Sequence, residues 1–180
     1  MPYNNQRSTN DYLEYLHQVI FSETNSNWKS FKITSNDFED IKKNIPRSPG
    51  IYQIKTDAPI NELLKVQDRK DPNHYNFKKK IDEALKLPNA LIIQEDTLNG
   101  YIVYTGHQAN LRQRFNEHFK GTKGTGCLSI FENENLQAYN WWFEYFDCSN
   151  IIEYNDSKLY RTFLEQFHRN KIGWPILCSQ

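Results

Sequence analysis

The sequence predicts a mixed α/β (α+β) domain in which three short strands lie among helices. Apolar and polar residues alternate over 51–55, directly after the turn at Pro49-Gly50, as they do in a half-buried strand. A second strand is expected over 101–104, and the aromatic, apolar stretch 139–146 predicts a central third strand. A chain of 180 residues suits one compact domain with its own core, so we expect a single domain over 1–180.

Two helices are expected in the first 48 residues, which we interpret as an N-terminal helical extension. Apolar residues recur at helical spacing over 10–22, and a polar loop follows. The second helix is expected over 34–45, where Asn36 can cap its start and Pro46 ends it. Neither helix contains residues that suggest catalysis.

Residues 57–99 separate the first two predicted strands and are interpreted as a helical insertion. Helices are expected over 60–66 and 75–87, and the second of them has a lysine-rich side. The apolar run 90–94 is too short for periodicity to distinguish a strand from the end of a helix. The turn at Asn99-Gly100 then opens the second strand.

The second strand leads directly into a helix with polar residues on one side. We expect the strand to stop at Gly106 and the helix to present Arg114 and His118, four residues apart, on one face near Tyr104. This trio suggests phosphate chemistry. The glycine-rich loop that follows lacks the Gly-Lys-Ser/Thr ending of a nucleotide-binding loop, so no nucleotide cofactor is expected.

The last helix is expected to begin at residue 156 or 157 and to end before Gly173. Its apolar residues Leu159, Phe163 and Phe167 are expected to face inward, with Leu164 as a further candidate. Glu165 lies between these apolar residues, where a carboxylate is unexpected.

Cysteine spacing and hydropathy exclude several classes of protein. The cysteines at 127, 148 and 178 form no Cys-x-x-Cys pair, which argues against a zinc ribbon and a disulfide framework. No apolar run approaches the roughly 20 residues that span a bilayer, and the N-terminus lacks the apolar core of a secretory signal. We therefore expect a cytoplasmic protein that does not contact a membrane.

The formal net charge of +0 conceals an uneven distribution. Residues 65–86 contain seven basic and four acidic residues, whereas 131–156 contain six acidic residues and no Lys or Arg. A nucleic-acid-binding protein is more often basic overall, so the total argues mildly against one. The acidic run either contacts a partner or keeps the protein soluble.

In combination, the strand and helix motifs resemble the GIY-YIG nuclease family. The two tripeptides are Gly50-Ile51-Tyr52 and Tyr104-Thr105-Gly106. In the family an arginine follows the second glycine by eight residues and a histidine or tyrosine by twelve, as Arg114 and His118 do here. Asn110-Leu111 also match the residues usual in the family.

The resemblance implies a small, mostly antiparallel three-stranded central sheet flanked by helices, and a DNA endonuclease that leaves 5′-phosphate and 3′-hydroxyl ends. Glu165 resembles the glutamate that binds the family's single divalent metal, Mg²⁺ or Mn²⁺. Arg114 would bind the non-bridging phosphate oxygens. Either Tyr52 or Tyr104 would take the proton of the attacking water, and His118 would orient that tyrosine or relay its proton.

Three positions depart from the family pattern. Residues 53–103 lie between the two tyrosines, where the family has a short hairpin. His107 replaces a common lysine and would contact phosphate when protonated, which would make activity sensitive to pH near neutrality. Cys178 replaces the asparagine of a terminal Pro-x-x-Asn, so that amide is either missing or supplied by another residue such as Asn170.

DNA is the expected partner. The predicted phosphate contacts are basic residues near the motifs and in the insertion: His107, Arg112, Lys120, Lys123, Lys78, Lys79 and Lys80. The short chain resembles restriction-type or phage-defence members of the family, and cutting both strands of a palindrome would favour a homodimer. The alternatives are a binding module that has lost catalysis, and a nuclease toxin or structure-specific, repair-like nuclease.

Overall fold

A computed structural model describes residues 28–67, 75–122, 125–150 and 157–178, together with Asp11, Glu14, Tyr15 and Gln18. Most of the helix expected over 10–22 lies outside the described residues, as does Lys123.

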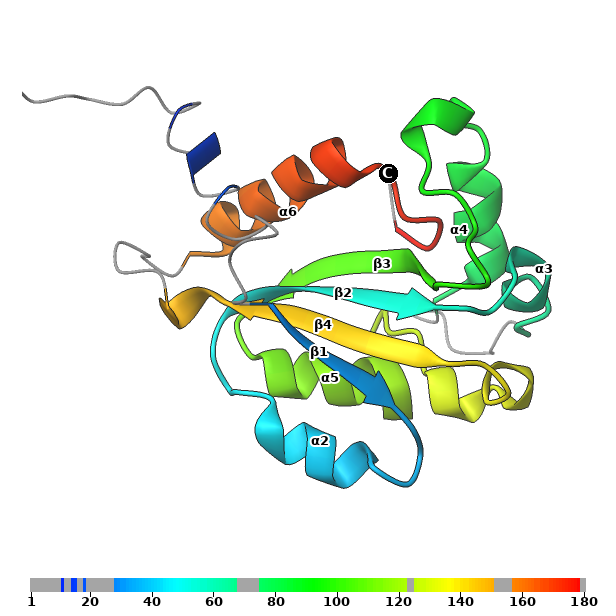
Figure 1. The fold of residues 1–180 in the computed structure, drawn as a ribbon, viewed down its shortest axis with the longest axis horizontal. Helices are drawn as coiled ribbons and strands as arrows, with labels where there is room; N and C mark the ends of the chain where they lie inside the picture. Colours follow the sequence, from blue (N-terminus) through cyan, green and yellow to red (C-terminus); the bar gives the residue numbers. More distant parts are fainter. Residues whose placement is uncertain are drawn as a thin grey trace, which may run out of the picture.

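A four-stranded antiparallel sheet forms the centre of the molecule, with strand order β1-β4-β2-β3 (Figure 1). β2 (Gly50–Thr56), β3 (Tyr101–Gln108) and β4 (Trp141–Asp147) are the three predicted strands. β1 (Lys29–Ile33) is a fourth strand, which pairs with β4. The predicted α+β class is confirmed, and the predicted three-stranded sheet is corrected to four strands.

β2 and β3 pair directly although the insertion separates them in sequence. Tyr52 lies opposite Gly106 and Ile54 lies opposite Tyr104, with a register shift after Ile54. β3 continues to Gln108, so the expected stop of the strand at Gly106 is wrong. The backbone hydrogen bonds of this antiparallel pair therefore join two strands that are distant in sequence.

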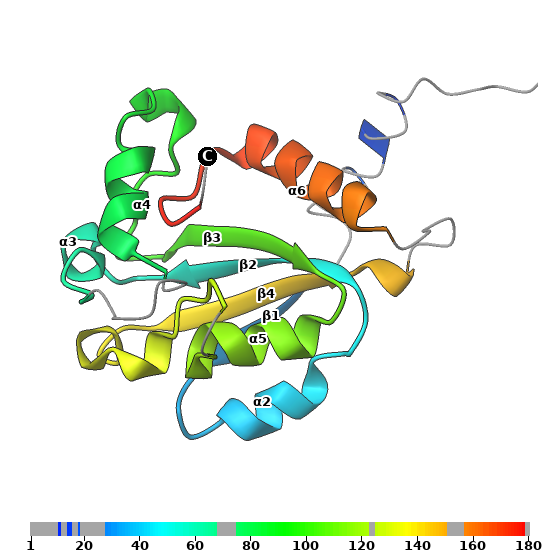
Figure 2. The ribbon, with the colours of Figure 1, turned by 180° about the vertical axis from the view of Figure 1, so that it is seen from behind.

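The insertion forms short helices at the end of the sheet where β2 finishes and β3 begins (Figures 1 and 2). α3 (Ile60–Leu63) and α4 (Phe77–Ala84) lie within the two predicted helices but are shorter. The ambiguous run 90–94 contributes to a 3₁₀ turn, η1 (Asn89–Leu91), and to an isolated bridge between Ile92 and Trp174.

Helices cover the two faces of the sheet unequally. α2 (Phe38–Asn44) and α5 (Leu111–Lys120) lie on one face, and α6 (Lys158–Ile172) lies on the other (Figures 1 and 2). Leu111, Phe115 and Phe119 of α5 point into the main core. Burial of their apolar area stabilises the packing of this helix on the sheet.

Side chains define where these helices begin. The side chain of Asn110 caps α5 by accepting a hydrogen bond from the backbone N–H of Gln113, 3.1 Å away. Ser157 caps α6, and residue 157 is one of the two positions at which the helix was predicted to begin. α2 starts later than expected, with Asp37 rather than Asn36 at its N-cap.

The inner face of α6 differs from the prediction. Leu164 is buried, but Leu159 is 79% exposed and Phe163 is 48% exposed. Much of the buried side of the helix is instead charged or polar, and it includes Arg161, Glu165, His168 and Arg169. The expectation that the apolar residues as a set face inward is therefore wrong for this helix.

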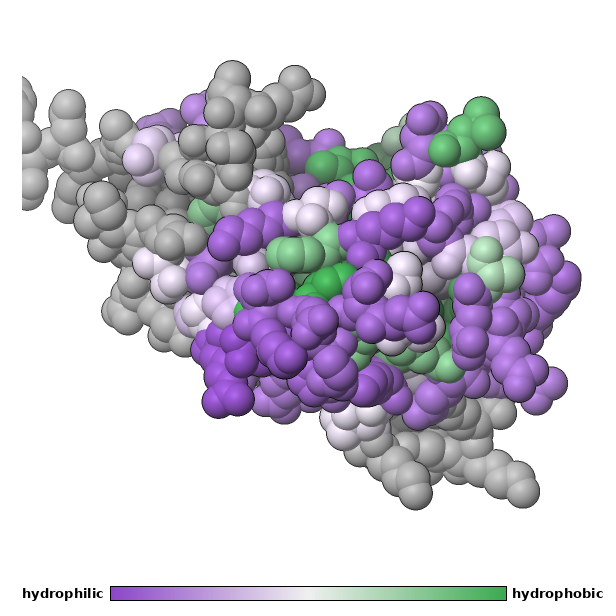
Figure 3. All heavy atoms as spheres, turned by 60° about the horizontal axis from the view of Figure 1, so that its bottom comes forward, coloured by the Kyte–Doolittle hydropathy of each residue, from purple (hydrophilic) through white to green (hydrophobic). Residues whose placement is uncertain are grey.

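The described helices include none long and apolar enough to cross a membrane. The face of the molecule in Figure 3 is largely hydrophilic, with a small hydrophobic area near its centre.

Candidate active site

Tyr52 lies at the centre of a buried polar cluster between β3 and α5. Its side chain is almost fully buried, and its hydroxyl oxygen accepts a hydrogen bond from Nε of Arg114 over 3.1 Å. Nε2 of His118 lies 2.9 Å from the same oxygen. Because Arg114 and His118 are one helical turn apart, α5 presents both to Tyr52. The structure thus brings together three of the predicted catalytic residues.

The backbone determines which nitrogen of His118 carries the proton. The N–H of Leu128 donates to Nδ1 over 3.3 Å, so Nδ1 has a free lone pair to accept it. Burial and the charge of Arg114 hold the pKa of His118 well below its ordinary value, so the ring is neutral at pH 7. A neutral imidazole has one N–H, so Nε2 must donate it to Tyr52. The Tyr52 oxygen therefore accepts two N–H hydrogen bonds.

Gly106 leaves the space that the Tyr52 ring occupies. A Cβ atom added at Gly106 would lie 2.3 Å from the hydroxyl oxygen of Tyr52. Any side chain at this position would displace the ring from Arg114 and His118. Glycine in the second tripeptide is thus explained by close approach of a ring to the backbone.

The guanidinium of Arg114 is fixed by two further partners. Its Nη1 donates to Oε2 of Glu117 over 2.8 Å, and its Nη2 donates to the carbonyl oxygen of Gly126 over 2.9 Å. Sequence analysis missed both, although the i, i+3 spacing of Arg114 and Glu117 on one helix could have indicated the ion pair.

Tyr104 packs beside Tyr52 in the same cluster. The two rings are stacked with their centroids 6.1 Å apart, and the Tyr104 ring lies 4.8 Å from that of His118. Burial raises the pKa of both phenols, that of Tyr52 well above its ordinary value, while the charge and hydrogen bonding of Arg114 oppose the rise. Both tyrosines are therefore protonated at neutral pH.

Glu165 lies on α6, which covers the other face of the sheet from α5 (Figure 1). Its carboxylate is buried and pairs through Oε1 with Arg169, whereas Oε2 lies 3.6 Å from Nε2 of His107. Burial raises the pKa of Glu165, and Arg169 opposes that rise. Its charge in turn raises the pKa of Tyr52 and Tyr104, so the carboxylate and the two phenols lie within electrostatic range of one another.

The donor chemistry of Glu165 fits a divalent cation. Carboxylate oxygens are ligands that Mg²⁺ prefers, and within the described parts of the chain Oε2 has Nε2 of His107 as a neighbour, 3.6 Å away. Among the described residues, no group of three or more His, Cys, Asp and Glu could hold a metal ion. Mg²⁺ usually keeps several waters and takes further oxygens from substrate phosphates, so one protein carboxylate is compatible with binding.

His107 lies against α6, next to Glu165. Its Nε2 is 3.0 Å from Oγ1 of Thr162, and its Nδ1 is buried with no hydrogen-bond partner among the described residues. Burial, with a further contribution from the charge of Arg161, lowers the pKa of His107 to about 4. The ring is therefore neutral at pH 7, which corrects the expectation of a protonated His107 near neutrality.

Cys178 and Arg169 together hold Thr105, the middle residue of the second tripeptide. The backbone N–H of Thr105 donates to Sγ of Cys178 over 3.2 Å. Arg169 donates from Nε to Oγ1 of Thr105 over 2.7 Å and from Nη2 to its carbonyl oxygen over 3.0 Å. Cys178 thus supports the motif strand directly. Asn170, the suggested substitute, lines a hollow on α6 beside Leu159 and Phe163 instead.

Two basic residues of α5 that are predicted to contact DNA also contact α2. Arg112 donates from Nε to the carbonyl oxygen of Ile45 over 2.7 Å and from Nη2 to that of Lys43 over 2.9 Å. Lys120 pairs with Glu39 of α2. These contacts link α5 to α2, and the role of Arg112 and Lys120 as phosphate contacts stays a prediction.

The lysines of the insertion lie on α4, away from the Tyr52 cluster. Lys78 pairs with Asp82 at 2.9 Å and Lys80 pairs with Glu83 at 3.0 Å, while Lys79 is exposed on the same helix. Internal ion pairs partly neutralise this helix, and exposed pairs of this kind contribute little to stability.

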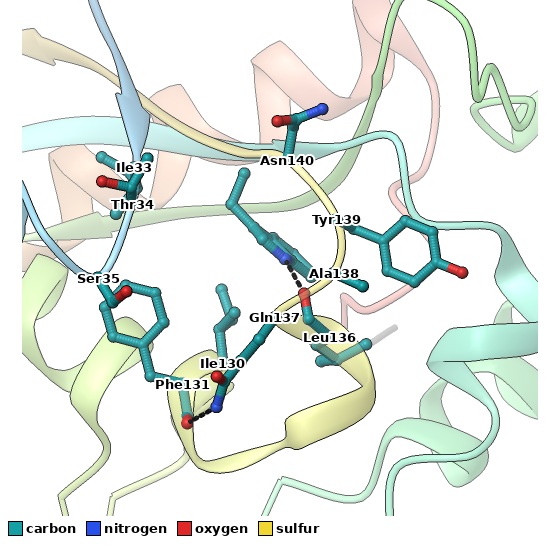
Figure 4. Close-up of a pocket in the computed structure, with 11 residues that line it drawn as sticks. Ile33, Thr34, Ser35, Ile130, Phe131, Leu136, Gln137, Ala138, Tyr139 and Asn140 are labelled. Carbon is teal, nitrogen blue, oxygen red and sulfur yellow. Dashed lines mark hydrogen bonds between the residues drawn. The ribbon is translucent and has the colours of Figure 1, made fainter.

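A cavity of about 350 Å³ lies elsewhere, between the end of β1 and the start of β4 (Figure 4). Its lining includes residues of two 3₁₀ turns, η2 (Ile130–Glu132) and η3 (Glu134–Leu136). Two of its polar groups are already paired, since Gln137 donates to the carbonyl of Phe131 and Trp141 to that of Leu136. The predicted site residues do not line it.

No protein-family model, curated protein or solved structure matches the chain.

Proposed function

We propose that the protein is a metal-dependent endonuclease that hydrolyses phosphodiester bonds of DNA to 5′-phosphate and 3′-hydroxyl ends. One observation carries the proposal: Nε of Arg114 and Nε2 of His118 both lie within hydrogen-bond distance of the Tyr52 oxygen, and both donate to it when the His118 proton is on Nε2. Hydrogen bonds donated to a phenol oxygen favour its ionised form, which is the form that can take a proton from water.

Tyr52 is the better candidate for the general base. Tyr104 shares the influence of Arg114, but His118 approaches the oxygen of Tyr52, and Tyr104 stacks on the ring of Tyr52. In the resting protein Tyr52 is protonated because burial raises its pKa. It must therefore lose its own proton to solvent before it can accept one from the attacking water, so the reaction should accelerate as the pH rises.

Arg114 supplies fixed positive charge beside the base. Glu117 and Gly126 hold its guanidinium, so no reorganisation is needed when charge develops on a phosphate. A guanidinium also matches two phosphate oxygens at once, which a lysine cannot do.

Glu165 would hold the divalent cation, Mg²⁺ or Mn²⁺, through Oε2, since Oε1 already pairs with Arg169. Bound there, the cation would supply positive charge against the phosphate and the leaving 3′ oxygen. The ion pair with Arg169 orients the carboxylate.

We extend the proposal to a restriction-type or phage-defence nuclease that acts as a homodimer, by analogy with the resembled family. The alternative of a binding module without catalysis depended on Cys178. The contact of its sulfur with Thr105 weakens that argument. The cysteine accepts a hydrogen bond from the motif strand, and support of the site is what the family's asparagine amide was expected to provide.

The test incubates the protein with supercoiled plasmid and phage DNA in Mg²⁺ or EDTA, beside the variants Tyr52→Phe and Glu165→Ala. Mg²⁺-dependent cutting with ligatable ends is expected for the wild type, with loss in both variants. Tyr101→Phe is the matched control, because the buried Tyr101 hydroxyl donates to the carbonyl of Ala58 outside the site. Discrete fragments would support a restriction enzyme. Absence of metal-dependent cutting by the wild type on every DNA would overturn the proposal.

A further inference from the structure

Tyr75, the residue two positions before α4, extends from the insertion into the candidate active site. Its ring stands edge-on to that of Tyr104, with the centroids 5.9 Å apart and the planes at 71°. It packs edge-on to Phe77 as well, with the centroids 6.2 Å apart. Edge-to-face contacts of this kind fix the relative orientation of aromatic rings.

A backbone segment from the C-terminal end of the chain also meets Tyr75. The Tyr75 hydroxyl donates to the carbonyl oxygen of Leu177. The N–H of Leu177 in turn donates to the carbonyl oxygen of Val103 over 2.9 Å, on the strand that carries Tyr104. The Tyr75 ring is therefore tied by its hydroxyl to the segment that covers β3.

The loop after α5 meets Tyr75 on another side. A Cβ atom added at Gly126 would lie 3.7 Å from Cδ2 of Tyr75, so the ring and the Gly126 backbone are in van der Waals proximity. The carbonyl of Gly126 is the acceptor for Nη2 of Arg114. Tyr75 thus contacts Tyr104, which stacks on Tyr52, and lies beside Gly126, whose carbonyl binds Arg114.

Tyr75 packs against the main core beside α4 and also contacts Tyr104. α4 already buries Phe77, Ile81 and Ala84 on one face, and Tyr75 precedes that face. The Tyr75 ring therefore joins the apolar face of α4, through Phe77, to the Tyr104 ring.

We propose that Tyr75 is a positioning residue of the active site, which holds the Tyr104 ring and the Gly126 carbonyl in place and, through them, Tyr52 and Arg114. This inference rests on the nuclease function proposed above. Without the Tyr75 ring, Tyr104 could turn into the vacated space and release its stacking on Tyr52. Because small misplacements of reacting groups slow a reaction strongly, the loss should appear in kcat. The insertion then takes part in the chemistry, beyond any contact that it makes with DNA.

The test compares Tyr75→Ala and Tyr75→Phe with Tyr101→Ala and Tyr101→Phe. Tyr101 is a matched control because it also borders the insertion and donates its hydroxyl to a backbone carbonyl, that of Ala58. Single-turnover and steady-state cleavage of a DNA substrate give kcat and KM, and denaturant unfolding gives the stability of each variant.

We expect Tyr75→Ala to lower kcat by about 10- to 100-fold with KM changed by less than about 3-fold. Tyr75→Phe keeps the ring and should restore most of kcat. Tyr101→Ala should lose stability to a similar extent but keep kcat among the folded molecules. Equal loss of kcat in the two alanine variants, or an unchanged kcat in Tyr75→Ala, would overturn the positioning role while leaving the nuclease itself intact. A wild type that cuts no DNA would instead overturn the nuclease and this role together.

Discussion

α5 and α6 both contribute polar residues to the candidate active site, but they are held to the sheet in different ways. α5 packs through apolar residues such as Phe115 and Phe119, and its polar residues lie beside that apolar side. α6 buries Leu164 beside charged residues such as Glu165 and Arg169, and leaves Phe163 half exposed.

The difference shows where apolar periodicity fails as a guide to orientation. Burial of apolar area orients α5, so its spacing identifies the inner face correctly. The inner side of α6 approaches a polar site, where ion pairs and hydrogen bonds to Thr105 are available. A helix orients by its total interaction energy, and the charged side of α6 has hydrogen-bond partners on β3.

Substitutions on the two sides of α6 provide the largest test of this comparison. Arg169→Met leaves Glu165 buried without its partner, so we expect the free energy of unfolding to fall by about 3–5 kcal/mol. Phe163→Ser on the outer side should change it by less than about 1 kcal/mol. The double variant Glu165→Gln/Arg169→Met should recover part of the loss, because no unpaired charge remains.

Denaturant unfolding of the three variants measures these effects. A larger cost for Phe163→Ser than for Arg169→Met would mean that α6 packs through its apolar side, as its spacing predicted.

Substitution of two arginines of α5 compares a residue of the candidate active site with a residue that contacts α2, within one helix. Arg114→Lys cannot bond Tyr52, Glu117 and Gly126 together, so we expect kcat for DNA cleavage to fall by about 10²- to 10³-fold. Arg112→Lys is the matched control, because Arg112 contacts backbone carbonyls of α2 and should change kcat by less than about 3-fold. Similar losses in both variants would show that α5 acts through its fold rather than through the Arg114 guanidinium.

The smallest expected effect is that of His107 on how the free energy of unfolding depends on pH. Its folded pKa of about 4 lies below the ordinary value of 6.5, so the folded protein favours the neutral ring. The neutral His107 ring therefore contributes its full stabilisation above pH 6.5. This stabilisation is lost as the pH falls toward 4.

Unfolding in EDTA at several pH values checks this sign. Between about pH 7 and pH 5 the wild type should lose about 1 kcal/mol more than His107→Gln, after allowance for solvent screening. Parallel pH curves for the two proteins would contradict the lowered pKa.

The sequence was most informative where the site is local in the chain. Tyr104, Arg114 and His118 lie on one strand and the helix that follows it, so their spacing alone places them together. The strands of the sheet were less evident. β1 was missed because its five residues include only Phe31 and Ile33 as apolar side chains, too few to establish alternation.

The residues that reach the site from outside the motifs were the least predictable. Tyr75 and Arg169 reach the site through tertiary packing, and neither lies in a motif. The contact of Arg112 with the carbonyl of Ile45, beside α2, was likewise not predicted from its position near Arg114. Neither outcome can be read from local spacing, because each depends on what the folded chain places opposite the residue.

The central claim is that Tyr52, held by Arg114 and His118, is the base that takes a proton from water. The most direct measurement is the pH dependence of kcat/KM for cleavage, with 3,5-difluorotyrosine in place of Tyr52, since fluorination lowers the pKa of a phenol. We predict that the wild-type rate rises with pH beyond about pH 8, and that the fluorinated protein reaches its maximum at lower pH. A pH profile that is the same for both proteins, or that levels off near the pKa of a histidine, would contradict the claim.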